Sequence, residues 1–121
     1  MKYHTIDFNG KEINFRLKSE DAVKLEEKTG VKLLDYIQDY SMKTIINLIR
    51  YMRKGEDSNF SEKDALILFD ELADNDWALE DIMKNIIYPT CQVSGLLTKG
   101  DLMKIYEKME NHQEATPQTN Q

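Results

Sequence analysis

Few side chains in this sequence have the type and spacing that catalysis or metal binding requires. The two histidines, His4 and His112, have no partners at metal-ligand spacing, so we expect no metal site. The single cysteine, Cys91, follows Pro89 in an apolar segment and lacks the nearby histidine or helix N-terminus that activates a thiol. We therefore expect Cys91 to be a small core or interface residue. One cysteine also allows no internal disulfide, as is usual in a reducing cytosol.

The densest group of carboxylates lies between residues 70 and 81. A calcium loop needs alternating oxygen ligands, a glycine at its sixth position and a glutamate at its twelfth. The glycine is missing here, and Trp77-Ala78-Leu79 already has helical character. We interpret the carboxylates as solvated groups at a junction between helices. They are Asp70, Glu71, Asp74, Asp76, Glu80 and Asp81.

Other catalytic signatures are also missing from the sequence. It contains no phosphate-binding loop, no nucleophile motif and no pair of acids in a plausible pocket. The sequence therefore predicts a protein that is not an enzyme and that uses no cofactor.

The composition narrows the class of partner. The chain has 121 residues, a formal charge of −6 and 40% hydrophobic residues, which is typical of one domain with a modest core. No apolar run approaches the roughly 20 residues of a membrane span, and the N-terminus has no secretory signal. Phosphate binding requires clustered Lys and Arg, so the excess of acid argues against nucleic acid as the main partner. We expect no membrane partner and no nucleic-acid partner.

The start of the chain predicts a β-hairpin over residues 3–17. Asn9-Gly10 separates two runs of alternating apolar and polar residues. A type I′ turn needs positive φ at both central positions, which Asn and Gly tolerate best. A two-residue loop at this point pairs Ile6 with Ile13.

Residues with helical periodicity follow the hairpin, and capping residues divide them into short helices. Ser19 has the position of an N-cap, and Gly30 that of the residue which ends the same helix. Ser41 and Ser61 are further expected caps. Pro89 removes a backbone donor, so it should either kink a helix or end it.

These elements predict an α+β fold that is mainly α, with an N-terminal β-hairpin followed by a compact bundle of about five to six short helices. The helices span residues 19–109, and the hairpin and helices together form one domain over 1–110. Residues 111–121 are polar apart from one alanine and include a histidine and a proline. Such a segment buries too little apolar surface to offset its ordering entropy, so we predict a disordered tail.

The opening of the chain resembles the tail assembly chaperones of long-tailed bacteriophages. These small proteins are encoded just before the tape measure protein, and they commonly begin with a short hairpin and an "RL…A…LEKK.G…LLD" segment. The likeness runs from about Thr5 to Leu97. The matching residues are Arg16-Leu17, Ala22, Leu25-Glu26-Glu27-Lys28-Thr29-Gly30 and Leu33-Leu34-Asp35.

The resemblance implies that the protein coats the tape measure protein, a long helical chain with apolar stripes, until tail tube subunits replace it. The tape measure protein would be the main partner and the tail tube protein a second one, and a homo-oligomer stays open. The resemblance also implies a location in the host cytoplasm, absence from the mature virion and no catalytic residue.

Apolar residues between 61 and 109 exceed one narrow helical stripe. We expect most of them to form the core and the surplus to line a groove or an oligomer face for an amphipathic helix. The six methionines would let such a face repack around varied sequences. The candidate partner-binding residues are Ile67, Trp77, Ile87, Tyr88 and Val93.

Two other functions are open alternatives. The first is a small acidic regulatory protein of a phage or mobile element that binds and inhibits a host protein. A mimic of DNA charge should cluster its carboxylates on one face, whereas Lys and Arg are interspersed here. The second is a DNA-binding helical domain, which the charge balance disfavours. A tape measure gene immediately downstream would favour the chaperone.

Overall fold

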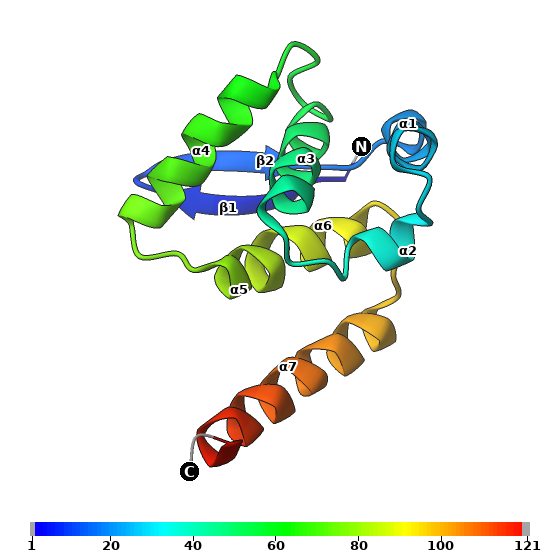
Figure 1. The fold of residues 1–121 in the computed structure, drawn as a ribbon. Coiled ribbons are helices and arrows are strands. Elements are labelled where there is room, and N and C mark those ends of the chain that lie inside the picture. Colours follow the sequence, from blue (N-terminus) through cyan, green and yellow to red (C-terminus); the bar gives the residue numbers. More distant parts are fainter. Residues whose placement is uncertain (1, 120–121) are drawn as a thin grey trace.

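The computed structural model describes residues 2–119, with side chains described for residues 2–111. The chain begins with an antiparallel hairpin and continues as helices, so the predicted α+β, mainly α fold is confirmed (Figure 1). The elements are β1 (His4–Phe8), β2 (Lys11–Phe15), α1 (Ser19–Thr29), α2 (Leu33–Tyr36), α3 (Met42–Arg53), α4 (Glu62–Asp74), α5 (Leu79–Ile82), the π-helix η1 (Met83–Ile87), α6 (Tyr88–Val93) and α7 (Lys99–Thr119).

The hairpin has the predicted turn and register. Asn9 and Gly10 both have positive φ, 54° and 78°, as a type I′ turn requires. Ile6 lies opposite Ile13, as expected from a two-residue loop. One face of the hairpin, which includes the fully buried Phe15, packs against the helices.

The expected helix caps are confirmed except at the start of the first helix. Gly30 ends α1 in the left-handed conformation, and Ser41 caps α3 by accepting the Thr44 N–H at 3.3 Å. The prediction of Ser19 as an N-cap is wrong, because Ser19 is already the first helical residue. The preceding Lys18 has the extended backbone of the N-cap position and makes no side-chain capping bond.

Two reciprocal capping pairs fix the starts of α4 and α7. Ser61 accepts the Asp64 N–H at 3.1 Å, and the Asp64 carboxylate accepts the Ser61 N–H at 3.0 Å. Thr98 and Asp101 exchange the same two bonds, each 3.0 Å long. The capping box predicted at Ser61 is confirmed, and both helices begin where their side chains satisfy the first free amides.

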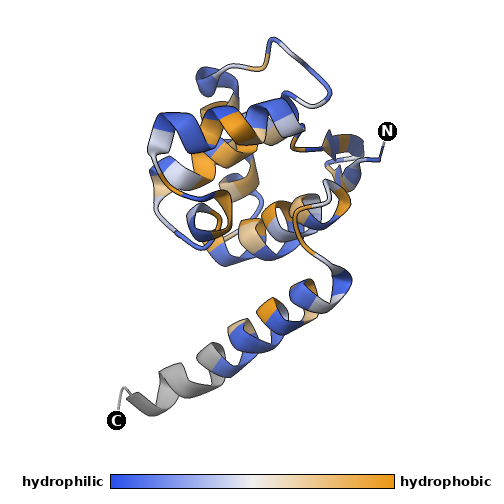
Figure 2. Cartoon of the chain, turned by 90° about the vertical axis from the view of Figure 1, so that its right-hand side faces the viewer, coloured by the Kyte–Doolittle hydropathy of each residue, from blue (hydrophilic) through white to orange (hydrophobic). Residues whose placement is uncertain are grey.

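Helix α3 lies at the centre of the core, between the hairpin and the later helices. Its residues Ile45, Leu48, Ile49 and Met52 are completely buried. It packs against β2, α4 and η1 (Figure 1). Hydrophobic residues gather where the helices of the main body face one another (Figure 2). Helix α7 extends away from that body, and no helix in the described part of the chain is long and apolar enough to cross a membrane.

Helix α7 continues to Thr119, which includes most of the segment predicted to be a disordered tail. The side chains of residues 112–121, among them His112, lie outside the described residues. The disorder of residues 111–121 therefore stays a prediction.

Pro89 does not end the helix in which it lies. The backbone stays helical from Leu79 to Val93, and one π turn precedes the proline. In this turn the Tyr88 N–H donates to the Met83 carbonyl, five residues back. Pro89 has no N–H to donate. The carbonyls of Lys84 and Asn85 therefore lose the donors they would have in a regular α-helix.

Two side chains from distant elements satisfy these carbonyls. His4 of β1 places Nε2 at 2.6 Å from the Asn85 carbonyl oxygen, which can only accept, so Nε2 carries the proton. The Tyr106 hydroxyl of α7 donates to the Lys84 carbonyl at 2.8 Å. The π turn thus holds both the N-terminal strand and the last helix.

We expect His4→Ala to lower the free energy of unfolding by about 1 kcal/mol, because the Asn85 carbonyl loses its donor. In a Pro89→Ala background, residue 89 regains an N–H that can serve Asn85. The same histidine change should then cost less. Urea unfolding of the four proteins in this double-mutant cycle measures the difference. Equal losses in both backgrounds would contradict the proposed exchange of donors.

Candidate partner-binding surface

The groups that could do chemistry are dispersed or buried. Among the described residues, no cluster of three or more His, Cys, Asp or Glu side chains could hold a metal ion. Cys91 is completely buried, which confirms its prediction as a core residue. Burial raises the pKa of the Cys91 thiol to about 12, so the reactive thiolate is not formed at neutral pH.

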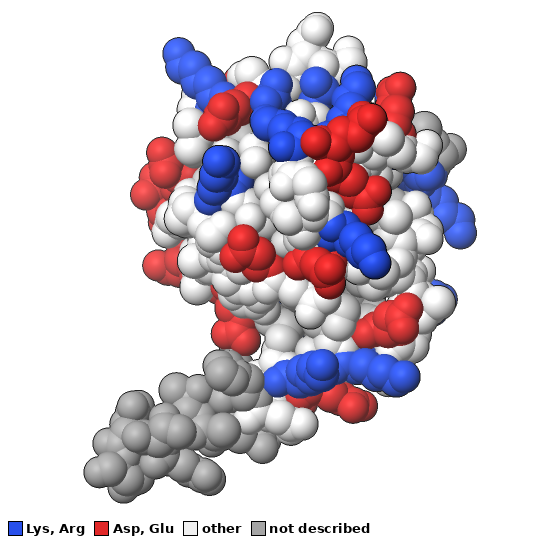
Figure 3. Space-filling model, turned by 45° about the vertical axis from the view of Figure 1, so that its right-hand side comes forward, with Lys and Arg blue, Asp and Glu red and all other residues white. Residues whose placement is uncertain are grey.

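The acidic run lies at the helix junction that the sequence predicted. Asp74 ends α4, and Asp76 turns the chain with a positive φ of 69°. The Asp81 carboxylate accepts the Ala78 N–H at 2.7 Å and so caps α5. Acidic and basic side chains are interspersed over the face in Figure 3, which does not favour a mimic of DNA.

The five predicted partner-binding residues fall into three environments. Ile67 is on the surface of α4, with 48% of its area exposed. Trp77 and Val93 are half-buried. Ile87 and Tyr88 are core residues with 0% and 3% exposure, so the prediction that they line an exposed face is wrong.

The reason for this burial is the spacing of the apolar residues. Successive buried pairs lie four residues apart, at Ile82-Met83, Ile86-Ile87 and Thr90-Cys91. In a regular α-helix, four residues turn through about 400°, so such a stripe drifts by about 40° at each repeat. The π turn has more residues per turn and keeps the pairs on one buried face. Tyr88 follows inward, and burial raises the pKa of its hydroxyl.

A surface hollow of about 370 Å³ lies between the hairpin turn and α4; we call it the hairpin–α4 hollow. One wall is the face of α4 formed by Asp64, Ile67, Leu68 and Glu71, which recur with helical spacing. The other residues lining it are Phe8, Asn9, Lys11 and Ile13 from the hairpin, and Arg53, Asp57 and Phe60 from the end of α3 and the loop after it.

Trp77 is connected to this hollow through Phe8. Its ring packs edge-to-face on Phe8, with the ring centroids 6.5 Å apart and an interplanar angle of 87°. The structure thus brings Ile67 and Trp77 to the same region. Val93 lies elsewhere, at the end of α6, where its carbonyl faces Arg16 at 3.4 Å.

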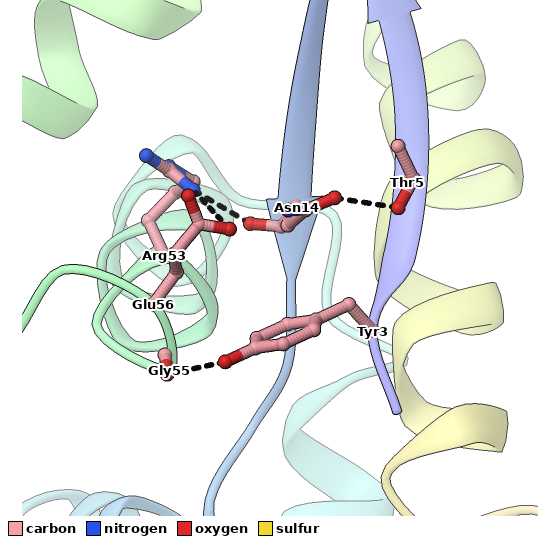
Figure 4. Close-up of polar contacts among 6 residues, drawn as sticks. All are labelled: Tyr3, Thr5, Asn14, Arg53, Gly55 and Glu56. Atoms are coloured by element: carbon pink, nitrogen blue, oxygen red, sulfur yellow. Dashed lines mark hydrogen bonds and ion pairs between the residues drawn. The ribbon is translucent and has the colours of Figure 1, made fainter. Parts of the chain in front are cut away.

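Arg53 is a fixed part of the hollow. Its Nη1 donates to the Asn14 carbonyl at 2.7 Å and lies 3.9 Å from the Glu56 carboxylate (Figure 4). Its guanidinium also lies 5.3 Å from the centre of the Phe60 ring. This charge is therefore already engaged within the chain, and it ties the loop after α3 to the hairpin.

The remaining charges around the hollow are mostly negative. Asp57, Asp64 and Glu71 form no ion pair within the part of the chain whose side chains are described, and Lys11 is the opposing cation. The hydrogen bond from the Ser61 N–H holds the pKa of Asp64 below its usual value, so this carboxylate stays ionised at neutral pH.

Sequence reasoning missed Phe8, Ile13 and Phe60 as residues of this surface. Phe60 offered a signal, since it is the one aromatic residue in the polar segment 54–64. Phe8 and Ile13 belong to the alternating apolar residues of the hairpin and offered no separate signal. Comparison of the chain with protein-family models, curated proteins and solved structures gives no match.

Proposed function

We propose that this protein is a non-enzymatic tail assembly chaperone. It binds apolar helical segments of a phage tape measure protein and keeps them in solution until tail tube subunits assemble. The proposal extends the resemblance of the segment from about Thr5 to Leu97 to the tail assembly chaperones. The structural observation behind it is the hairpin–α4 hollow, whose lining combines apolar side chains, among them Phe8, Ile67 and Leu68, with charged ones.

Such a surface suits reversible binding of an amphipathic helix. A surface hollow that combines exposed apolar side chains with charged ones can receive a segment of another protein. An amphipathic helix presents its apolar residues at i, i+3, i+4 and i+7, which a shallow groove can receive. The small size of the hollow favours binding that tube subunits can later displace, because few contacts have to break.

Co-expression with the tape measure protein of the same genome tests this function. We expect the soluble fraction of the tape measure protein, measured after centrifugation, to rise several-fold when the chain is present. The tape measure protein should also co-purify with the tagged chain. An unrelated acidic protein of similar size is the control, because net charge alone can improve solubility. An equal soluble fraction with either protein would contradict the proposal.

A further inference from the structure

We propose that the hairpin–α4 hollow selects a helix that carries one large apolar side chain and a Lys or Arg one turn away from it. This inference rests on the proposed function and specifies the chemistry of the bound segment. The occupant is therefore a basic amphipathic helix, rather than an acidic peptide or a nucleic acid.

The apolar part of the hollow determines which side chain of the bound helix can enter it; we call this side chain the anchor. Ile67 is half exposed at its edge, and Phe8 and Leu68 are buried beneath the surface. A volume of about 370 Å³ is at the lower end of the range for binding sites, roughly 300–1,000 Å³. The space therefore accepts one Leu, Met or Phe side chain from a helix that lies across the opening, not the helix itself.

The charged part of the hollow determines the charge of the partner residue that lies one turn from the anchor. Asp64 lies three residues before Ile67, and Glu71 lies four residues after it. Each carboxylate is therefore one helical turn from Ile67, at whose side chain the anchor enters. A helix aligned with α4 can therefore place a cation against one of them. Arg53 has the Glu56 carboxylate as its own partner at 3.9 Å, so the lining keeps three carboxylates, Asp57, Asp64 and Glu71, against the cation of Lys11.

The charge of α4 as a whole has the same sign. The helix carries five carboxylates, at Glu62, Asp64, Asp70, Glu71 and Asp74, and one cation, Lys63. Complementary charge steers a partner and excludes like charge, which fixes the sign of the partner's flanking residues.

Trp77 provides a direct readout of binding. It is the single tryptophan of the chain, and it packs on Phe8, which lines the hollow. Two synthetic helical peptides without tryptophan, of about 18 residues, serve as ligands. Both carry the same leucine stripe, and Lys flanks the stripe in one peptide and Glu in the other. We expect the Lys peptide to bind about three- to tenfold more tightly at low salt, with the difference shrinking as salt is added.

Matched substitutions on α4 locate the site. Ile67→Asp should weaken binding of the Lys peptide at least tenfold, since it places a charge at the edge of the anchor position. Leu66→Asp is the control, because Leu66 is equally exposed at 46% but does not line the hollow. Glu71→Lys should reverse the preference between the two peptides. Asp70→Lys changes the net charge equally, outside the hollow, and should leave the preference in place.

Several results would overturn the inference. The first is equal affinity for the two peptides, and the second is an equal loss of peptide affinity in Ile67→Asp and Leu66→Asp. The third is a dimer, seen in sedimentation, that Ile67→Asp dissociates and the peptide does not. Circular dichroism of each variant checks that it is folded. If wild type keeps the tape measure protein soluble and Ile67→Asp does so equally well, the hollow is wrong and the proposed function stands. If the peptides bind as expected and the tape measure protein stays insoluble, the proposed function fails by itself.

Discussion

Gly55→Ala is expected to lower the free energy of unfolding by about 3 kcal/mol. A Cβ at this position would overlap the carbonyl oxygen of Arg16 and come within 3.1 Å of its carbonyl carbon. The obstacle is backbone, so no side-chain rotation can relieve it. The Arg16 N–H donates to the Met52 carbonyl at 2.9 Å, and the Tyr3 hydroxyl lies 3.5 Å from the Gly55 carbonyl (Figure 4). Both contacts would have to shift together with the strand.

Urea unfolding of Gly55→Ala beside Gly100→Ala measures this effect. At Gly100 the nearest atom to an added Cβ is the Thr98 Oγ1 at 3.7 Å, an ordinary contact. Since Gly100 lies in the first turn of α7, alanine there should stabilise the protein by up to about 1 kcal/mol. A Gly55→Ala protein as stable as wild type would show that the strand and the end of α3 are not held this closely.

Tyr88→Ala is expected to lower the free energy of unfolding by about 3–5 kcal/mol. The side chain is 3% exposed and follows the π turn into the core. Removing the ring leaves a cavity among side chains that are themselves held by their neighbours. We expect the thermal unfolding midpoint of this variant to fall steeply, with partial unfolding at physiological temperature.

Tyr88→Phe is the matched control. It keeps the ring and removes the hydroxyl, whose neighbour is Tyr40, so the expected loss is about 1 kcal/mol. A Tyr88→Ala protein that melts close to wild type would contradict the burial of this ring. A loss of partner binding in Tyr88→Ala is explained by loss of the fold, so Ile67→Asp is the informative change for binding.

The local features of the fold could be predicted from the sequence. The Asn9-Gly10 turn, the end of α1 at Gly30 and the capping box at Ser61 depend on residues within a few positions of one another. Each is decided by backbone conformation or by a side chain that reaches its own first turn, so the local sequence contains the whole cause. The one wrong cap was Ser19, because the N-cap position of α1 is one residue earlier, at Lys18.

Part of the candidate surface could be predicted as well. Ile67 and Trp77 were identified as surplus apolar residues; Ile67 lines the hairpin–α4 hollow, and Trp77 packs on Phe8, which lines it. Phe8, which contacts Trp77 and lines the hollow, comes from the hairpin, far away in the sequence. Periodicity gives the face of one helix, but it does not state which other element comes to lie beside that face.

Only the tertiary structure decided the course of the chain around Pro89. The sequence left open whether Pro89 kinks the helix or ends it, and in the structure the helix continues because His4 and Tyr106 supply donors that it lacks. The sequence determined the hairpin, the helix ends and the net charge because these depend on neighbouring residues. The packing decided the π turn, the burial of Tyr88 and the need for glycine at position 55, because each depends on atoms brought together from distant parts of the chain.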